Sequence, residues 1–135
     1  MSIRSAPVRR KGMSKDNEGS DVMEIMMFVV ADPAVDVGPV DEEAVAEWDR
    51  LRAEQGVLKR AMRLRPADEA VTVRVRGGET IVTDGPFTES KEWIAGYDIL
   101  EVDDLDHAIE LAKGDELARH GALEIRPFWP LNGEE

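Results

Sequence analysis

Asp84 is the residue that the sequence marks most clearly for chemistry. It ends a predicted strand over residues 79–84 and is followed by Gly85 and Pro86, which favour a turn. A carboxylate held at the end of a strand can act as a general base or anchor a ligand. The same three residues also suit a purely structural turn. The sequence leaves both interpretations of Asp84 open.

Arg74 and Tyr97 are the other candidate ligand-binding residues. The guanidinium of Arg74 can bind a carboxylate in bidentate fashion, which predicts an anionic ligand. The alternatives are an ion pair for Arg74 and simple packing for Tyr97. If Gly77-Gly78 forms a hairpin turn, Asp84 lies opposite Val71, on the other hairpin face from Arg74. The three candidates then share one cleft only if the strand end twists or a second subunit contributes Arg74.

Other reactive residue types are scarce. The chain has no cysteine, which excludes disulfides, iron–sulfur clusters, thiolate zinc sites and a cysteine nucleophile. It has two histidines, His107 and His120, and their positions predict neither a metal site nor a carboxylate beside either ring. No phosphate-binding glycine loop or Ser-His-Asp order is present. We therefore expect no metal and no cofactor.

Size and charge narrow the class of protein. The chain has 135 residues and a net charge of −12, which predict one acidic domain and argue against nucleic-acid binding. It has no apolar stretch long enough for a membrane span and no signal-peptide pattern, so we expect a cytoplasmic protein. Residues 1–22 carry five basic and three acidic groups and few large apolar residues. We predict a disordered basic tail over 1–22, a domain over 23–130 and a short tail over 131–135.

The elements that would position the candidate residues can be predicted from apolar spacing and turn residues. Helices are expected at 42–55, capped by Asp41 and ended by Gly56, and from about 105, capped by Asp103 or Asp104. Strands are expected at 24–30, 57–64, 71–75, 79–84, 96–102 and 123–128. This order predicts an α+β, ferredoxin-like sandwich: an antiparallel sheet with two helices on one face. The open face then needs a cover, and a second copy of the chain is the simplest one.

A motif in this sequence resembles a known family. Residues 83–97 read Thr-Asp-Gly-Pro-Phe-Thr-Glu-Ser-Lys-Glu-Trp-Ile-Ala-Gly-Tyr, and the chain continues with Asp104-Leu105-Asp106 and Glu124-Ile125-Arg126-Pro127. This succession resembles the DGPF type of the YCII-related (YciI-like) family over roughly residues 23–130. The resemblance implies a homodimeric α+β barrel with a small-molecule cleft.

What the resemblance implies about activity is less specific. Many DGPF-type proteins have no assigned activity, some are encoded beside extracytoplasmic-function sigma factors, and a few relatives degrade halogenated aromatics. Some relatives carry a His–Asp pair suited to acid–base chemistry. The first predicted helix of this chain, from Glu42, has no histidine. This departure argues against histidine-dependent catalysis.

Three functions remain open at this point. The first is binding of a small organic, anionic molecule in a cleft of the dimer. The second is an enzyme for isomerase- or lyase-type proton transfer with Asp84 as the base. The third is an interaction module accessory to a sigma factor. A polar cavity at the hairpin would favour the first two.

Overall fold

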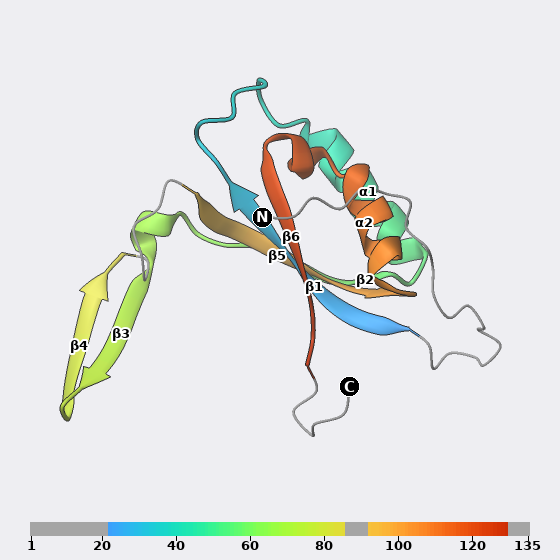
Figure 1. Cartoon of the computed structure of the whole chain (residues 1–135). Coiled ribbons are helices and arrows are strands. Elements are labelled where there is room, and N and C mark those ends of the chain that lie inside the picture. Colours follow the sequence, from blue (N-terminus) through green and yellow to red (C-terminus); the bar gives the residue numbers. More distant parts are fainter. Residues whose placement is uncertain (1–21, 86–91, 130–135) are drawn as a thin grey trace.

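The computed structural model describes residues 22–85 and 92–129 (Figure 1). These described residues form six strands and two α-helices, in the predicted order, together with two short 3₁₀ helices. The elements are β1 (Met23–Ala31), α1 (Glu42–Glu54), β2 (Leu58–Arg63), η2 (Ala67–Glu69), β3 (Val71–Arg76), β4 (Glu79–Asp84), β5 (Trp93–Val102), α2 (Leu105–Lys113), η3 (Glu116–Arg119) and β6 (Gly121–Pro127).

Four strands form the main sheet, in the order β2-β5-β1-β6, with every pair antiparallel. With the β3–β4 hairpin set aside, this is the strand order of a ferredoxin-like fold. The predicted α+β architecture is therefore confirmed. β5 begins at Trp93, earlier than the predicted Gly96, because its pairing with β1 continues past a register shift between Val29 and Val30.

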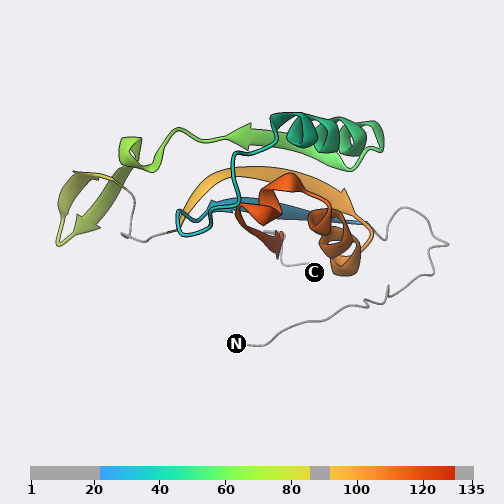
Figure 2. The same ribbon diagram turned by 90° about the horizontal axis from the view of Figure 1, so that it is seen from above.

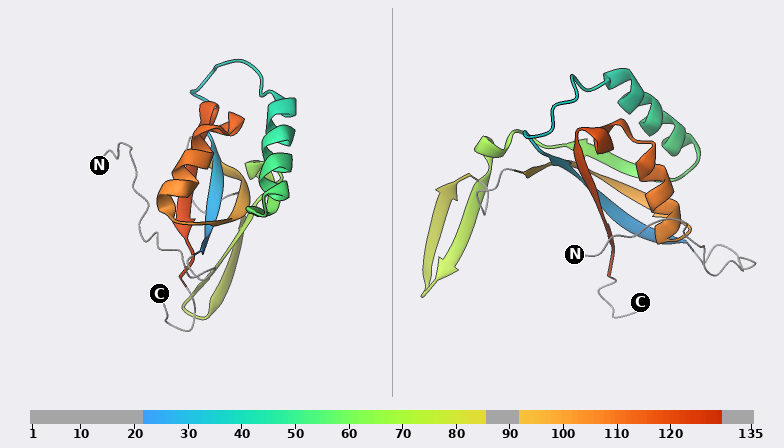
Figure 3. Two further views of the ribbon diagram at one scale, coloured as in Figure 1. Left: turned by 90° about the vertical axis from the view of Figure 1, so that its right-hand side faces the viewer. Right: turned by 45° about the horizontal axis from the view of Figure 1, so that its top comes forward.

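The two helices cover one face of the main sheet, as predicted (Figure 3). The core joins buried apolar side chains of β1 and β5 to Trp48 of α1 and Ala108 of α2. The indole nitrogen of Trp48 also donates to the carbonyl oxygen of Leu111 at 3.1 Å, which ties the two helices together. The opposite face of the sheet carries Met26, Phe28 and other half-buried apolar residues with no helix against them.

Both helices begin at aspartates. The Asp41 carboxylate accepts from the backbone N–H groups of Glu43 and Ala44, and the Asp104 carboxylate accepts from that of His107. These bonds satisfy N–H groups that have no partner within the helix. α1 is followed by Gly56 in the left-handed conformation, with φ at +77°. The predicted start of each helix and the glycine after the first are confirmed.

The β3–β4 hairpin is a separate two-stranded sheet that extends away from the helices (Figures 1 and 2). Its turn is formed by Gly77 and Gly78, both at positive φ, and Val71 pairs with Asp84, as predicted. The valines of β3 are each about 60% exposed, so the hairpin buries little apolar surface in one chain.

Two further sequence predictions lie outside the described residues. The tail predicted over 1–22 is described only from Val22, and the one predicted over 131–135 is not described. The DGPF motif is described only through Gly85, and the next described residue is Glu92.

Candidate functional site

A pocket of about 910 Å³ lies between α1 and the β2–β5 edge of the main sheet; we call it the α1 pocket. Most of its lining side chains are apolar, and the polar ones are mainly carboxylates. The lining comprises Val29, Val40, Glu42, Val45, Asp49, Ala61, Met62, Arg63, Leu64, Arg65, Pro66, Ala67, Asp68, Trp93, Ala95, Gly96, Asp98, Asp115 and Leu117. Its volume lies within the range of sites that bind small organic molecules.

Gly96 allows β2 and β5 to approach closely beneath this pocket. A Cβ at this position would lie 2.6 Å from the carbonyl oxygen of Met62 and 3.3 Å from the Cα of Arg63. Both neighbours are backbone atoms, so any side chain would push the strands apart. The residues that follow Gly96 alternate, with Tyr97 on the open face of the sheet and Asp98 on the helix face.

Three aspartates from different elements line the pocket together. Asp49 comes from α1, Asp98 from β5 and Asp115 from the turn before η3. Asp98 is 7% exposed and Asp115 is 4% exposed. Carboxylates are almost never buried to this degree without a partner. Asp98 and Asp115 are therefore unusually buried for carboxyl groups.

Of the three aspartates, Asp98 is buried with no hydrogen bond or ion pair from residues 22–85 and 92–129 to offset its burial. Burial, and then the negative charges of Asp49 and Asp115, raise the pKa of Asp98 to about 7. Asp98 therefore exists as both acid and carboxylate near neutral pH.

The two neighbouring aspartates are shifted in the same direction. Burial is the main cause that raises the pKa of Asp115, although the backbone N–H of Leu117 donates to its carboxylate at 3.0 Å and opposes that rise. Burial also raises the pKa of Asp49. The positive charge of Arg52 lowers the pKa of Asp115 and so opposes part of its rise. The inner end of the pocket is therefore acidic and poorly neutralised.

The arginines of the pocket lie at its mouth. Arg63 and Arg65 have largely exposed side chains that form ion pairs with Glu42 and Glu69, with closest N–O distances of 3.7 and 3.0 Å. Exposed pairs of this kind contribute little energy, and neither pair involves the buried aspartates. The lining as a whole contains five carboxylates and two guanidinium groups.

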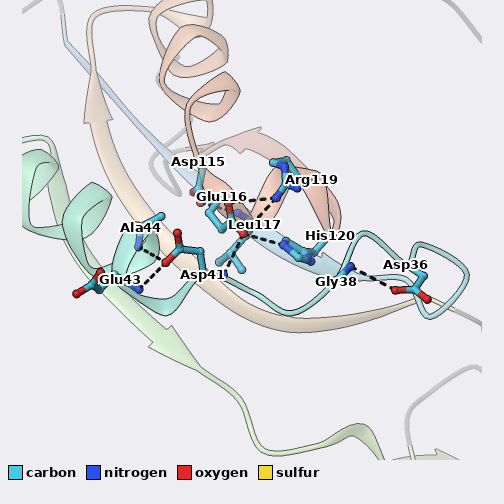
Figure 4. Close-up of polar contacts among 10 residues, drawn as sticks. All are labelled: Asp36, Gly38, Asp41, Glu43, Ala44, Asp115, Glu116, Leu117, Arg119 and His120. Carbon is cyan, nitrogen blue, oxygen red and sulfur yellow. Dashed lines mark hydrogen bonds and ion pairs between the residues drawn. The ribbon is translucent and has the colours of Figure 1, made fainter.

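Glu116 links the loop before α1 to η3, two elements that border the pocket (Figure 4). Its carboxylate accepts from the backbone N–H of Asp41 at 3.0 Å and lies 2.8 Å from Nε2 of His120. The Asp41 N–H, followed by His120, lowers the pKa of Glu116 to about 2. An ionised Glu116 therefore holds the start of α1 against the Asp115–Leu117 turn.

The residues singled out from the sequence lie elsewhere. Asp84 and Arg74 are on opposite faces of the β3–β4 hairpin, as their register predicts, and Asp84 is exposed. Tyr97 lies on the open face of the main sheet, where its hydroxyl oxygen is 3.4 Å from Nε of Arg60. None of the three lines the α1 pocket. Within one chain the structure does not bring them together, and their roles stay predictions.

The strand end at Asp84 is held by backbone contacts. The N–H of Gly85 donates to the carbonyl oxygen of Ala70 at 2.7 Å, and the hydroxyl of Thr72 donates to the carbonyl oxygen of Gly85 at 2.7 Å. Gly85 has φ at +105°, a conformation that favours glycine. These contacts support the structural interpretation of the motif.

Sequence reasoning missed the three pocket aspartates. The sequence did carry a signal for Asp98, because its side chain lies on the same face of β5 as Gly96, Leu100 and Val102, which are all buried. A carboxylate among inward-facing positions is unusual enough to mark. Asp115 gave no comparable signal, because its burial depends on contacts between elements distant in sequence.

The histidine prediction was wrong, because each ring lies beside a carboxylate four residues earlier. The contacts are His107 Nδ1 to Asp103 at 3.7 Å and His120 Nε2 to Glu116 at 2.8 Å. Such spacing brings side chains together on helical turns, which was a readable signal. Neither histidine lines the pocket.

Two further site classes are a membrane span and a metal centre. Over the described ranges, no helix is long and apolar enough to cross a membrane. In the same part of the chain, no group of three or more histidine or acidic side chains is arranged to hold a metal ion.

Comparison with known proteins identifies the family. The sequence model of the YCII-related domain matches residues 23–132. The chain is also 40% identical, over 81 residues, to an uncharacterised protein of Rhizobium meliloti (strain 1021); the match covers 58% of this chain and 65% of that protein, just under two-thirds of its length. The resemblance seen in the sequence is confirmed, and the chain belongs to the YCII-related family.

Proposed function

We propose that this protein binds a small organic molecule in the α1 pocket. The observation that carries the proposal is Asp98, a carboxyl group that is 7% exposed, lines the pocket and has no partner among the described residues. Such a group is costly to bury unless something satisfies it. A ligand that hydrogen-bonds to Asp98 while its body fills the apolar lining would do so.

The charge of this pocket bears on the kind of ligand. The sequence predicted an anion because of Arg74, which does not line the pocket. The buried carboxyl groups at the inner end repel an anion, and the arginines at the mouth are paired with glutamates. A neutral or cationic molecule therefore suits the α1 pocket better than an anionic one.

A fragment screen with a blocked pocket tests this function. Val45 faces the pocket from α1, and Val45→Trp would fill it. Val37→Trp is the matched control, because Val37 lies 47% exposed in the loop before α1, outside the pocket lining. We expect fragments that raise the melting temperature of the wild type and of Val37→Trp, and that fail to stabilise Val45→Trp. Equal stabilisation of all three proteins would place binding elsewhere.

A second candidate function is proton-transfer catalysis, with Asp98 rather than Asp84 as the acid–base group. The pKa of about 7 favours it, because a group that titrates near the working pH can both accept and donate a proton. Turnover of a bound fragment that disappears in Asp98→Asn and persists in Asp84→Asn would support it. The opposite pattern would restore the original assignment to Asp84.

We also propose a homodimer formed through the open face of the main sheet. Apolar side chains there are half-buried with no helix over them, among them Met26, Phe28 and Ile99. Phe28→Glu would place a charge in such an interface, and Val37→Glu would place one on the exposed loop. Light scattering should give a dimer mass for the wild type and for Val37→Glu, and a monomer mass for Phe28→Glu. A monomeric wild type at micromolar concentration would refute the dimer.

A further inference from the structure

The inner end of the α1 pocket combines two features that point to one class of ligand. The acidic groups Asp49, Asp98 and Asp115 all line it, and they come from three separate elements. Asp98 is more than nine-tenths buried and receives no hydrogen bond or ion pair from the described residues. A fold that only had to be stable would not gain from such a group.

The wall beside these carboxyl groups is apolar. Val45, one helical turn before Asp49, and Leu117, whose N–H donates to Asp115, line the same pocket. A ligand that fits both parts therefore has an apolar body and a charged or strongly donating end.

We propose, building on the proposed function, that the α1 pocket selects a small organic ammonium ion, whose nitrogen meets Asp98 while its apolar body lies against Val45 and Leu117. An ammonium group is all donor and no acceptor, so it matches acceptors that have no donor of their own. The contact would be a charge-assisted hydrogen bond to a carboxyl group that is 7% exposed, and such bonds are stronger than those between neutral groups.

A bare metal ion fits this site less well than an organic cation. Over residues 22–85 and 92–129, no three histidine or acidic side chains are arranged as a metal site. An inorganic ion would also leave the apolar wall unused, whereas an amine with a ring or chain would bury it.

Binding of a cation here should release a proton. Without ligand, burial and the nearby negative charges keep part of the Asp98 population protonated at neutral pH. An ammonium ion favours the carboxylate and would displace that proton. The charged groups that face this site from the surrounding elements are Glu42, Asp49 and Arg52 of α1, Arg63 of β2, Arg65 and Asp68 of the following segment, Asp115 before η3 and Glu116 of η3. Arg52 and Glu116 do so by acting on Asp115. Carboxylates outnumber arginines among them, and the two mouth arginines are already paired.

The test uses three probes with one shared ring: benzylamine, benzyl alcohol and benzoate. By calorimetry at pH 8, we expect benzylamine to bind about tenfold or more tightly than benzyl alcohol, and benzoate to bind most weakly. Benzylamine affinity should rise about tenfold from pH 6 to pH 8 as Asp98 loses its proton. Buffers of different ionisation enthalpy should report release of about half a proton at pH 7.

Two matched variants locate the effect. Asp98→Asn should remove both the amine preference and the proton release, with its fold checked by the melting temperature at pH 8. Asp36→Asn removes the same charge from the exposed loop before α1, outside the pocket lining, and should keep both properties.

The results separate this inference from the proposed function. If benzyl alcohol or benzoate binds as tightly as benzylamine, and Val45→Trp blocks it, the pocket is real and the cation selectivity is wrong. Amine binding that survives Asp98→Asn overturns the assignment of Asp98. If no fragment or probe binding is sensitive to Val45→Trp, the proposed function itself fails.

Discussion

The β3–β4 hairpin and the α1 pocket place aspartates in opposite environments. Asp84 ends an exposed strand, at the start of the segment that carries the family motif. Hydrogen bonds to the backbone of Gly85, the next residue, hold this turn in place. Asp98 is buried on a strand with an ordinary alternating pattern, and nothing described satisfies its carboxyl group. A recognisable motif can therefore mark a turn, whereas a reactive environment is assembled from distant segments.

The largest expected effect comes from Asp98→Asn at alkaline pH. The folded-state pKa of about 7 lies above the 3.8 of an ordinary aspartate, so the folded state holds the proton more tightly. Neutral Asp98 is tolerated below pH 4, and stability falls as pH rises towards 7. Asp98→Asn lacks this fall and should exceed the wild type by about 2–3 kcal/mol at pH 8.

Urea unfolding at pH 5 and pH 8 measures this difference. Asp84→Asn is the matched control on the hairpin and should follow the wild type at both values. If the free energy of unfolding of Asp98→Asn varies with pH as that of the wild type does, the pKa of Asp98 is not raised in the folded protein.

Alanine substitutions at two glycines compare the stability of the pocket region with that of the hairpin. Gly96→Ala places a Cβ against the backbone of β2 below the pocket and should cost about 2 kcal/mol. Gly77→Ala in the hairpin turn meets open space, and its cost of about 1 kcal/mol arises from φ at +58° alone. The free energy of unfolding of the two variants checks this order. A more harmful Gly77→Ala would mean that the hairpin contributes more to stability than its exposure suggests.

Glu116→Gln tests whether the pocket border depends on an ionised side chain. The lowered pKa of Glu116 means that its contribution is full above pH 4.5 and is lost as pH falls towards 2. The variant should melt a few degrees below the wild type at pH 7 and converge with it at low pH. A constant difference across this range would indicate lost packing rather than lost charge.

The smallest expected effect is on the hairpin. Asp84→Asn and Arg74→Ala should leave fragment binding in the α1 pocket unchanged, because neither residue lines it. Thermal-shift titrations of both variants with the fragments that stabilise the wild type provide the measurement. A clear loss of binding in either variant would return the site to the hairpin, with a second subunit as the means of bringing the residues together.

The sequence predicted the fold well because the fold depends on local signals. Asp41, Asp104 and Gly77-Gly78 are caps and turns, and the structure places each one as its residue type predicts. The register of the hairpin followed from its two-residue turn.

The candidate site was harder to predict from the sequence. Asp49, Asp98 and Asp115 are separated by 49 and 17 positions, and only the strand order brings them together. Asp98 could have been suspected because it lies on the buried face of β5. The pocket around it depends on how α1 lies against the edge of the sheet, which local sequence patterns do not reveal. The motif drew attention to Asp84 because sequence similarity records a turn as readily as it records a functional group.

A direct titration of the Asp98 carboxyl group by carbon-detected NMR tests the central claim. The protein is followed from pH 4 to pH 9, with Asp98→Asn used to assign the resonance. We expect a midpoint near 7, which reflects a buried carboxyl group close to other carboxylates in the α1 pocket. A midpoint near 4 would show that Asp98 is as well solvated as an exposed aspartate, and it would remove the feature that distinguishes the pocket from the hairpin.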